Sequence, residues 1–119
     1  MKYRIVEKDN KKYIMYEGDK KKISTENDVI DIVSTSFEHD TGLIIINSKA
    51  LSEDFFNLRT GLAGVMLQKF INYHIKFVIL LDNKEDLSLR FKELVGEANR
   101  GNEFRVVADI AEGEKWLLI

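Results

Sequence analysis

A short segment near the middle of the chain combines residue types that could bind an anion. A guanidinium beside a hydroxyl group can hold a phosphate or a carboxylate through charge-assisted hydrogen bonds. An apolar helical pattern starts in the same segment, and the free N–H groups of a first helical turn also favour negative charge. The segment therefore predicts a surface that contacts a small anion or a partner protein. Its candidate binding residues are Asp54, Phe55, Phe56, Arg59, Thr60, Gly61 and Gly64.

Arg59 and Thr60 also have a structural explanation that needs no ligand. Thr60 could cap the helix through its hydroxyl group, as threonine commonly does. Arg59 could form a surface ion pair with Glu53 or Asp54, which is usually worth less than about 1 kcal/mol. No glycine-rich phosphate-binding loop precedes the helix, and its absence favours this structural explanation.

The glycines and phenylalanines of the segment are expected to serve packing first. Gly61 and Gly64 lie three residues apart on one face of the predicted helix, where they would let its backbone approach a strand closely. Glycine within a helix costs about 1 kcal/mol relative to alanine, so we expect a close contact between the helix and a strand to compensate for it. Of Phe55 and Phe56, one should enter the core, and the other would form an interaction patch if it is exposed.

Glu38, His39 and Asp40 suggest metal binding or proton transfer at first sight, because a histidine stands between two carboxylates. Neighbouring residues at a helix end point in different directions, so these three cannot easily converge on one ion. His39 and His74 each precede a predicted parallel strand, which places both at the amino edge of the sheet. Open α/β sheets bind ligands at the other edge, so we expect capping or surface roles here and no metal.

Support for catalysis is limited. The chain has no cysteine and only two histidines, and it lacks the GxSxG motif of many hydrolases and the GxGxxG motif of dinucleotide-binding enzymes. Hydrolysis by a pair of carboxylates stays open, although Asp54, Asp82 and Glu85 are equally well explained as solvated or capping groups. We therefore expect no cofactor, and we lean towards a protein that is not an enzyme.

The candidate segment needs a scaffold, and the hydrophobic periodicity predicts an α/β fold. Two β-rich stretches, 3–7 and 13–16, flank an Asp9-Asn10 turn signal and should form an antiparallel hairpin. Continuous apolar runs at 43–47, 75–81 and 104–108 predict strands that are covered on both faces. Helical periodicity predicts three longer helices and a short C-terminal one; the three longer helices are expected at about 26–39, 58–73 and 87–98.

The resulting order is β-β-α-β-α-β-α-β-α, which requires crossover connections. We therefore expect one domain over residues 1–119, with a mixed, mainly parallel five-stranded sheet and four helices. Beyond the carboxyl ends of two strands lie 47–52 and 82–86, where such a sheet usually binds ligands. Capping boxes, Thr25 with Asp28 and Asp109 with Glu112, should start the first and the last helix. The predicted core contains Ile44, Ile46, Val78, Leu80, Phe91, Val106 and Trp116.

Composition restricts the class of partner. With 45% hydrophobic and 32% charged residues and a formal net charge of −2, the chain of 119 residues is typical of a globular protein. Its apolar runs are far too short to span a bilayer, and the absence of cysteine suits a reducing compartment, so we expect a cytoplasmic protein with no membrane partner. Nucleic acid is not expected either, because the clustered lysines fall in predicted turns, where solvation is the default. These are Lys11, Lys12, Lys20, Lys21 and Lys22.

Several stretches spread over the chain carry a family resemblance: KISTENDVIDIV, FEHDTGLIIIN, DFFNLRTGLAGVMLQKFINY, SLRFKELVGEANRGNEFRV and EGEKWL. Through them the whole chain resembles a bacterial family of small proteins known only as a domain of unknown function. The resemblance implies no activity and no site.

The order of elements and the final EKWL helix also resemble the STAS domains, the anti-sigma-factor antagonist fold. In that fold an Asp-Ser-Ser-Gly-Leu stretch opens the helix after the third strand, and its second serine is phosphorylated. The matching residues here are Leu58, Arg59, Thr60, Gly61 and Leu62, so the resemblance implies that Thr60 occupies the phosphoacceptor position. Leu58 and Arg59 stand where STAS domains have the aspartate and the first serine.

Two classes of function follow from the sequence. The first, which we favour, is a non-enzymatic binding or regulatory module whose region 54–64 contacts a partner protein or a small anion. The second is a small enzyme that acts on an acidic or phosphorylated metabolite, held by Arg59 and Thr60, with a carboxylate such as Asp54 as acid or base. A third, structural alternative is a homodimer that buries Phe55 or Phe56 across a two-fold axis.

Overall fold

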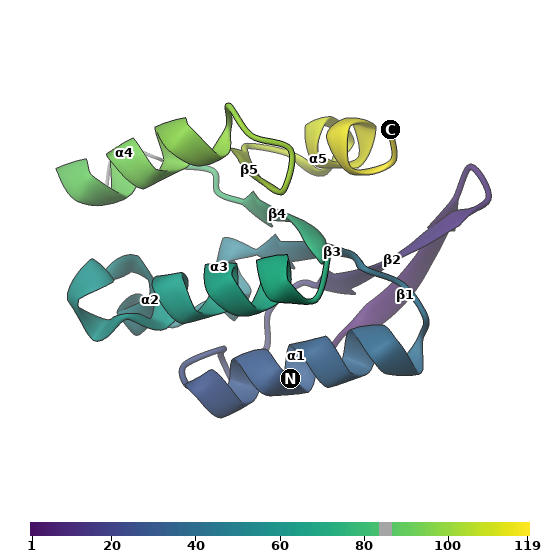
Figure 1. Ribbon diagram of the computed structural model, residues 1–119, viewed down its shortest axis with the longest axis horizontal. Helices are drawn as coiled ribbons and strands as arrows, with labels where there is room; N and C mark the ends of the chain where they lie inside the picture. Colours follow the sequence, from purple (N-terminus) through teal and green to yellow (C-terminus); the bar gives the residue numbers. More distant parts are fainter. Residues whose placement is uncertain (84–86) are drawn as a thin grey trace.

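A computed structural model describes residues 1–83 and 87–119. The protein has a five-stranded sheet, and helices pack against it (Figure 1). The edge strand β1 pairs antiparallel with its neighbour β2, and all the other neighbouring strands pair parallel. This confirms the predicted mixed, mainly parallel sheet and its element order. Residues 84–86, with Glu85 and part of the predicted 82–86 loop, lie outside the described residues. The strands, in their order across the sheet, are β1 (Arg4–Lys8), β2 (Lys11–Tyr16), β3 (Leu43–Asn47), β4 (Lys76–Leu80) and β5 (Phe104–Val107).

The hairpin between β1 and β2 closes as its turn residues predict. Asp9 and Asn10 both have positive φ angles, 55° and 64°. Two consecutive left-handed residues match the twist of the flanking strands, and aspartate and asparagine tolerate this conformation better than most residues. Lys8 consequently pairs with Lys11 across the turn.

Two of the helices begin with the capping residues that the sequence predicts. At the start of α1, the Thr25 hydroxyl accepts a hydrogen bond from the Asp28 N–H at 3.2 Å, and the Asp28 carboxylate accepts one from the Thr25 N–H at 3.1 Å. At the start of α5, Asp109 Oδ1 accepts from the Glu112 N–H at 2.8 Å. The helices are α1 (Glu26–Glu38), α2 (Glu53–Phe56), α3 (Leu62–Asn72), α4 (Leu89–Ala98) and α5 (Ile110–Leu117), with single 3₁₀ turns η1 (Ser48–Ala50) and η2 (Leu58–Thr60).

The long helix predicted over 58–73 is wrong at its start. Gly61 has a φ angle of 78°, a left-handed conformation that ends η2 and precedes the first residue of α3, Leu62. Asn57 supports η2 because its side-chain oxygen accepts a hydrogen bond from the Arg59 N–H at 3.1 Å. Arg59 therefore belongs to a separate turn and not to the helix, although the apolar spacing continued through both.

The helices form two unequal layers on the sheet. Each crossover from β2 to β5 moves in the same direction along the sheet, and right-handed crossovers then place α1, α3 and α4 on one face. Helix α5 lies on the opposite side from α1 and α3 (Figure 1). The larger core accordingly joins side chains such as Ile44 and Ile46 to Phe70 and Phe91 of the helices.

The smaller core lies under α5 and explains the one core residue that was predicted incorrectly. Val78 and Leu80 are buried there together with Leu117. Trp116 is only half-buried, because it lies at the margin of this layer with Lys76 and Arg105 over its ring. The other predicted core residues, Ile44, Ile46, Val78, Leu80, Phe91 and Val106, are all buried. None of the helices formed by the described residues has the length and apolar character needed to cross a bilayer.

Candidate functional site

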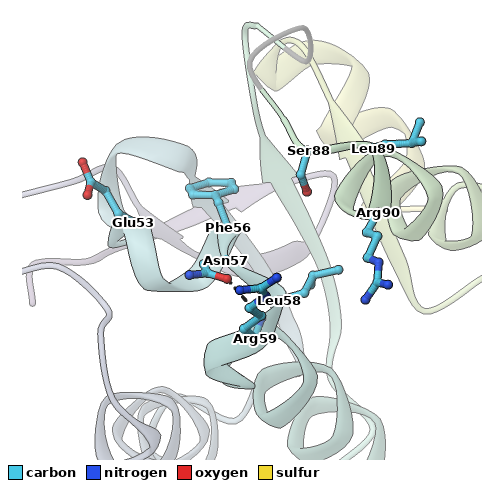
Figure 2. Close-up of a pocket in the computed structure, with 8 residues that line it drawn as sticks. All are labelled: Glu53, Phe56, Asn57, Leu58, Arg59, Ser88, Leu89 and Arg90. Atoms are coloured by element: carbon cyan, nitrogen blue, oxygen red, sulfur yellow. Dashed lines mark hydrogen bonds between the residues drawn. The ribbon is translucent and has the colours of Figure 1, made fainter.

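A cleft opens between the α2–η2 segment and the start of α4 (Figure 2). Its position follows from the topology, because α2 and η2 come after the carboxyl end of β3 and α4 comes after the carboxyl end of β4. Open α/β sheets usually bind ligands at this edge. The cleft has a volume of about 770 Å³ and is lined by Glu53, Phe56, Asn57, Leu58, Arg59, Ser88, Leu89 and Arg90.

Two arginines line the cleft from different elements. Arg59 belongs to η2 and Arg90 to the first turn of α4, and Figure 2 shows both side chains beside the opening. Both are exposed, and neither forms an ion pair with a residue in 1–83 or 87–119. The predicted alternative of a surface pair between Arg59 and Glu53 or Asp54 is therefore wrong. Two guanidinium groups without an ion-pair partner among the described residues can attract anions to the opening that they line.

The two phenylalanines of the segment divide as predicted between core and surface. Phe55 is only 2% exposed, whereas Phe56 is half-buried and lines the cleft. The Phe56 ring centroid lies 5.3 Å from that of Phe55 and 5.4 Å from that of Phe91. These buried rings hold Phe56 in place, so the cleft has a firm aromatic wall.

Thr60 is exposed but does not line the cleft, and its hydroxyl group is engaged within the chain. The Thr60 hydroxyl group donates towards two carbonyl oxygens, that of Asp54 at 2.5 Å and that of Asn57 at 2.9 Å. It also accepts from the Leu62 N–H at 3.3 Å, while the N-cap position itself is taken by Gly61. Thr60 thus ties α2 and η2 to the first residue of α3, and phosphorylation of this oxygen would remove its donor.

The packing role predicted for Gly61 and Gly64 is wrong. Both are exposed, and a Cβ atom added at either would meet nothing within 4 Å. Gly61 is explained instead by its left-handed backbone, which other residues adopt only with strain. Gly64 is an ordinary helical residue of α3 with open space around it, and nothing in the structure explains its presence.

The cleft therefore includes only part of the predicted segment. Phe56 and Arg59 line it, and Asp54, Phe55, Thr60, Gly61 and Gly64 do not. Sequence analysis missed the wall contributed by α4, with Ser88 and Arg90. The sequence held a signal for this wall, because a serine, a common N-cap residue, stands before the helical pattern that follows the second buried strand. In the structure Ser88 is the N-cap of α4, and its hydroxyl oxygen accepts from the Phe91 N–H at 3.2 Å.

A second hollow of about 550 Å³ adjoins the cleft. It shares three wall residues with the cleft, Glu53, Phe56 and Ser88, and extends towards the carboxyl end of β4. The residues that line only this hollow are Ser48, Leu81, Asp82, Asn83 and Leu87. This places part of the predicted ligand edge, 47–52 and 82–86, beside the arginine cleft.

The histidine segment lies elsewhere. His39 caps the end of α1, and its Nε2 atom lies 3.0 Å from the hydroxyl oxygen of Tyr3. The nearest carboxylate oxygen of Glu38 lies 3.8 Å from the same Nε2 atom. Among residues 1–83 and 87–119, no group of three or more histidine and acidic side chains is arranged to hold a metal ion.

Comparison with known proteins gives a family but no activity. The family model described as a domain of unknown function, DUF4180, matches residues 8–117. Comparison with the curated proteins found no match, and neither did comparison with the solved structures. Because the match extends over nearly all of its length, the chain belongs to the DUF4180 family.

Proposed function

We propose that this protein is a non-enzymatic binding module that holds a phosphate or carboxylate group in the cleft between η2 and α4. The observation that carries the proposal is the pair of exposed guanidinium groups, Arg59 and Arg90, at one opening and without a carboxylate partner among the described residues. Guanidinium groups bind both kinds of anion through paired hydrogen bonds. The N-terminal turn of α4 lines the same opening and adds the favourable end of a helix dipole.

A binding role fits the cleft better than catalysis. The carboxylate proposed as acid or base, Asp54, does not line the cleft, and the carboxylate of Glu53 points away from both arginines in Figure 2. The resemblance of the element order to STAS domains, which are regulatory binding modules, supports the same choice. A small metabolite and an acidic or phosphorylated side chain of a partner protein offer the same anionic group, so the proposal covers both sources.

The test is a titration with inorganic phosphate and with acetate at low ionic strength, followed by thermal unfolding and by NMR. An anion that binds the folded protein raises its melting temperature. We expect Arg59→Ala and Arg90→Ala each to weaken binding by about tenfold, the usual effect of losing a charge-assisted hydrogen bond. Added salt should weaken binding in the wild type because exposed charges are screened.

Arg100→Ala is the matched control. Arg100 is exposed just beyond the other end of α4, outside the cleft, so its removal changes the net charge equally. The proposal fails if neither anion binds, or if the Arg59 and Arg90 variants bind as Arg100→Ala does.

A further inference from the structure

We infer that the anion held by this cleft is the phosphate of a larger compound of the mononucleotide type, which also occupies the adjoining hollow. The inference rests on the proposed function, since it uses the same arginines for the phosphate. It adds to the ligand a flat ring that carries N–H donors at the end away from the phosphate.

The first argument is the continuity of the space. The cleft of about 770 Å³ and the hollow of about 550 Å³ share Glu53, Phe56 and Ser88 as walls. A single elongated molecule can therefore pass from one to the other. A free phosphate ion would leave most of this space to water.

The second argument is the change in chemistry along that space. Arg59 and Arg90 line only the cleft, whereas Ser48 and Asp82 line only the hollow, where no arginine or lysine is present among the described lining residues. Glu53 lines both spaces, so the arginines make the difference in charge between them. The cleft thus suits an anion, and the hollow suits groups that donate hydrogen bonds. A carboxylate such as that of Asp82 can accept from the ring N–H or exocyclic amine of a nucleobase.

The third argument is the wall between the two ends. Phe56 borders both spaces and is supported from behind by Phe55 and Phe91, with ring centroids 5.3 and 5.4 Å away. The hollow beside it is further lined by Leu81 and Leu87. A flat ring can pack against such an aromatic wall. Because the core already fixes Phe56, binding does not have to order its side chain. A mononucleotide has the phosphate at one end and, at the other, a flat base that carries N–H donors.

The test compares affinities for inorganic phosphate, phenyl phosphate, ribonucleoside monophosphates and the matching nucleosides by calorimetry and NMR. We expect the best nucleotide to bind about tenfold more tightly than phosphate, as ring stacking commonly provides. Asp82→Asn should weaken nucleotide binding by about fivefold, the order expected when a charged acceptor becomes neutral, and should leave phosphate binding unchanged. Phe56→Leu keeps an apolar side chain in the wall and should reduce the advantage of the nucleotide over phosphate.

Asp54→Asn is the matched control, because this exposed carboxylate lies close by in α2 but outside both spaces. Nucleotides that bind no more tightly than phosphate, or phenyl phosphate that binds as tightly as nucleotides, would overturn the inference and leave the anion-binding function intact. Equal effects of Asp82→Asn and Asp54→Asn would also overturn it. Nucleotide binding that Arg59→Ala and Arg90→Ala leave unchanged would overturn both proposals.

Discussion

The ammonium nitrogen of Lys76 lies 4.4 Å from the centroid of the Trp116 ring and donates a hydrogen bond to the Trp116 carbonyl oxygen at 3.0 Å. It also lies 3.3 Å from the Leu117 carbonyl oxygen. The first residue of β4 therefore holds the last turn of α5, where the carbonyl groups lack helical partners and the helix dipole favours a cation. Burial, together with Lys11 and Arg105, lowers the pKa of this lysine.

Lys76→Met should loosen α5 from the sheet. The variant keeps the apolar stem but loses the two hydrogen bonds and the cation–π contact, so we expect the free energy of unfolding to fall by about 1–2 kcal/mol. Urea unfolding measures this change, with Trp116, the single tryptophan, as a local fluorescence probe. Lys92→Met, at an exposed position of α4, should change stability by less than about 0.5 kcal/mol. Equal stability of the two variants would contradict the role of Lys76.

The free energy of unfolding should fall at acid pH because of Glu114. Its carboxylate accepts from the Tyr13 hydroxyl at 2.7 Å and from Lys8 Nζ at 3.0 Å, and the side chain is only 14% exposed. The hydrogen bond from Tyr13, followed by the effects of Lys8, lowers the pKa of Glu114 below its ordinary value of 4.5. A lowered carboxylate pKa adds stability that is present above about pH 4.5 and is lost as the pH falls through the folded-state pKa.

Glu114→Gln tests this contribution. At pH 7 the variant should be less stable by about 1–2 kcal/mol, because a charged acceptor becomes neutral. Between pH 7 and pH 3 it should lose less stability than the wild type, as measured by urea unfolding at several pH values. Glu17→Gln is the control, since its pair with Arg4 is about half exposed on both sides and such pairs contribute little. The same pH dependence in the wild type and in Glu114→Gln would rule out this role.

Two helical glycines should respond in opposite ways to alanine. A Cβ atom on Gly64 would meet nothing within 4 Å, so Gly64→Ala should stabilise the protein by about 0.5–1 kcal/mol through helix propensity. A Cβ atom on Gly113 would lie 3.1 Å from Val78 Cγ1 and 3.5 Å from Leu80 Cδ2, so Gly113→Ala should push α5 off the sheet and cost about 1–3 kcal/mol. Thermal unfolding of both variants measures the contrast. A stabilising Gly113→Ala would show that α5 can shift without loss.

Thr60→Val should destabilise the turn that carries Arg59. The valine cannot donate to the carbonyl groups of Asp54 and Asn57 or accept from the Leu62 N–H, so we expect a loss of about 1 kcal/mol. Thr60→Ser keeps the hydroxyl group and should recover most of this stability. If both variants unfold alike in urea, the hydroxyl contacts contribute nothing.

The residue pattern was sufficient for the elements and their order where local and tertiary preferences agree. Asp9-Asn10 and Thr25 with Asp28 act through turn geometry and capping, which are local in sequence. The apolar runs of β3, β4 and β5 are a local pattern that agrees with their burial on both faces in the fold. The pattern failed at Gly61, since apolar spacing continues through a left-handed residue that periodicity cannot register. It also overestimated the burial of Trp116, whose ring shares the margin of the small core with Lys76 and Arg105.

The sequence by itself determined that this chain forms a mixed, mainly parallel α/β sheet, and it predicted that Arg59 and one of Phe55 and Phe56 lie on a candidate binding surface. Only the tertiary structure decided that Arg90 and Ser88 form the other wall, and that the hydroxyl of Thr60 is used within the chain. The physical reason is that strand and helix preferences depend on neighbours a few residues away. A cleft depends on which distant segments leave adjacent parallel strands at the same edge, and on where their side chains point.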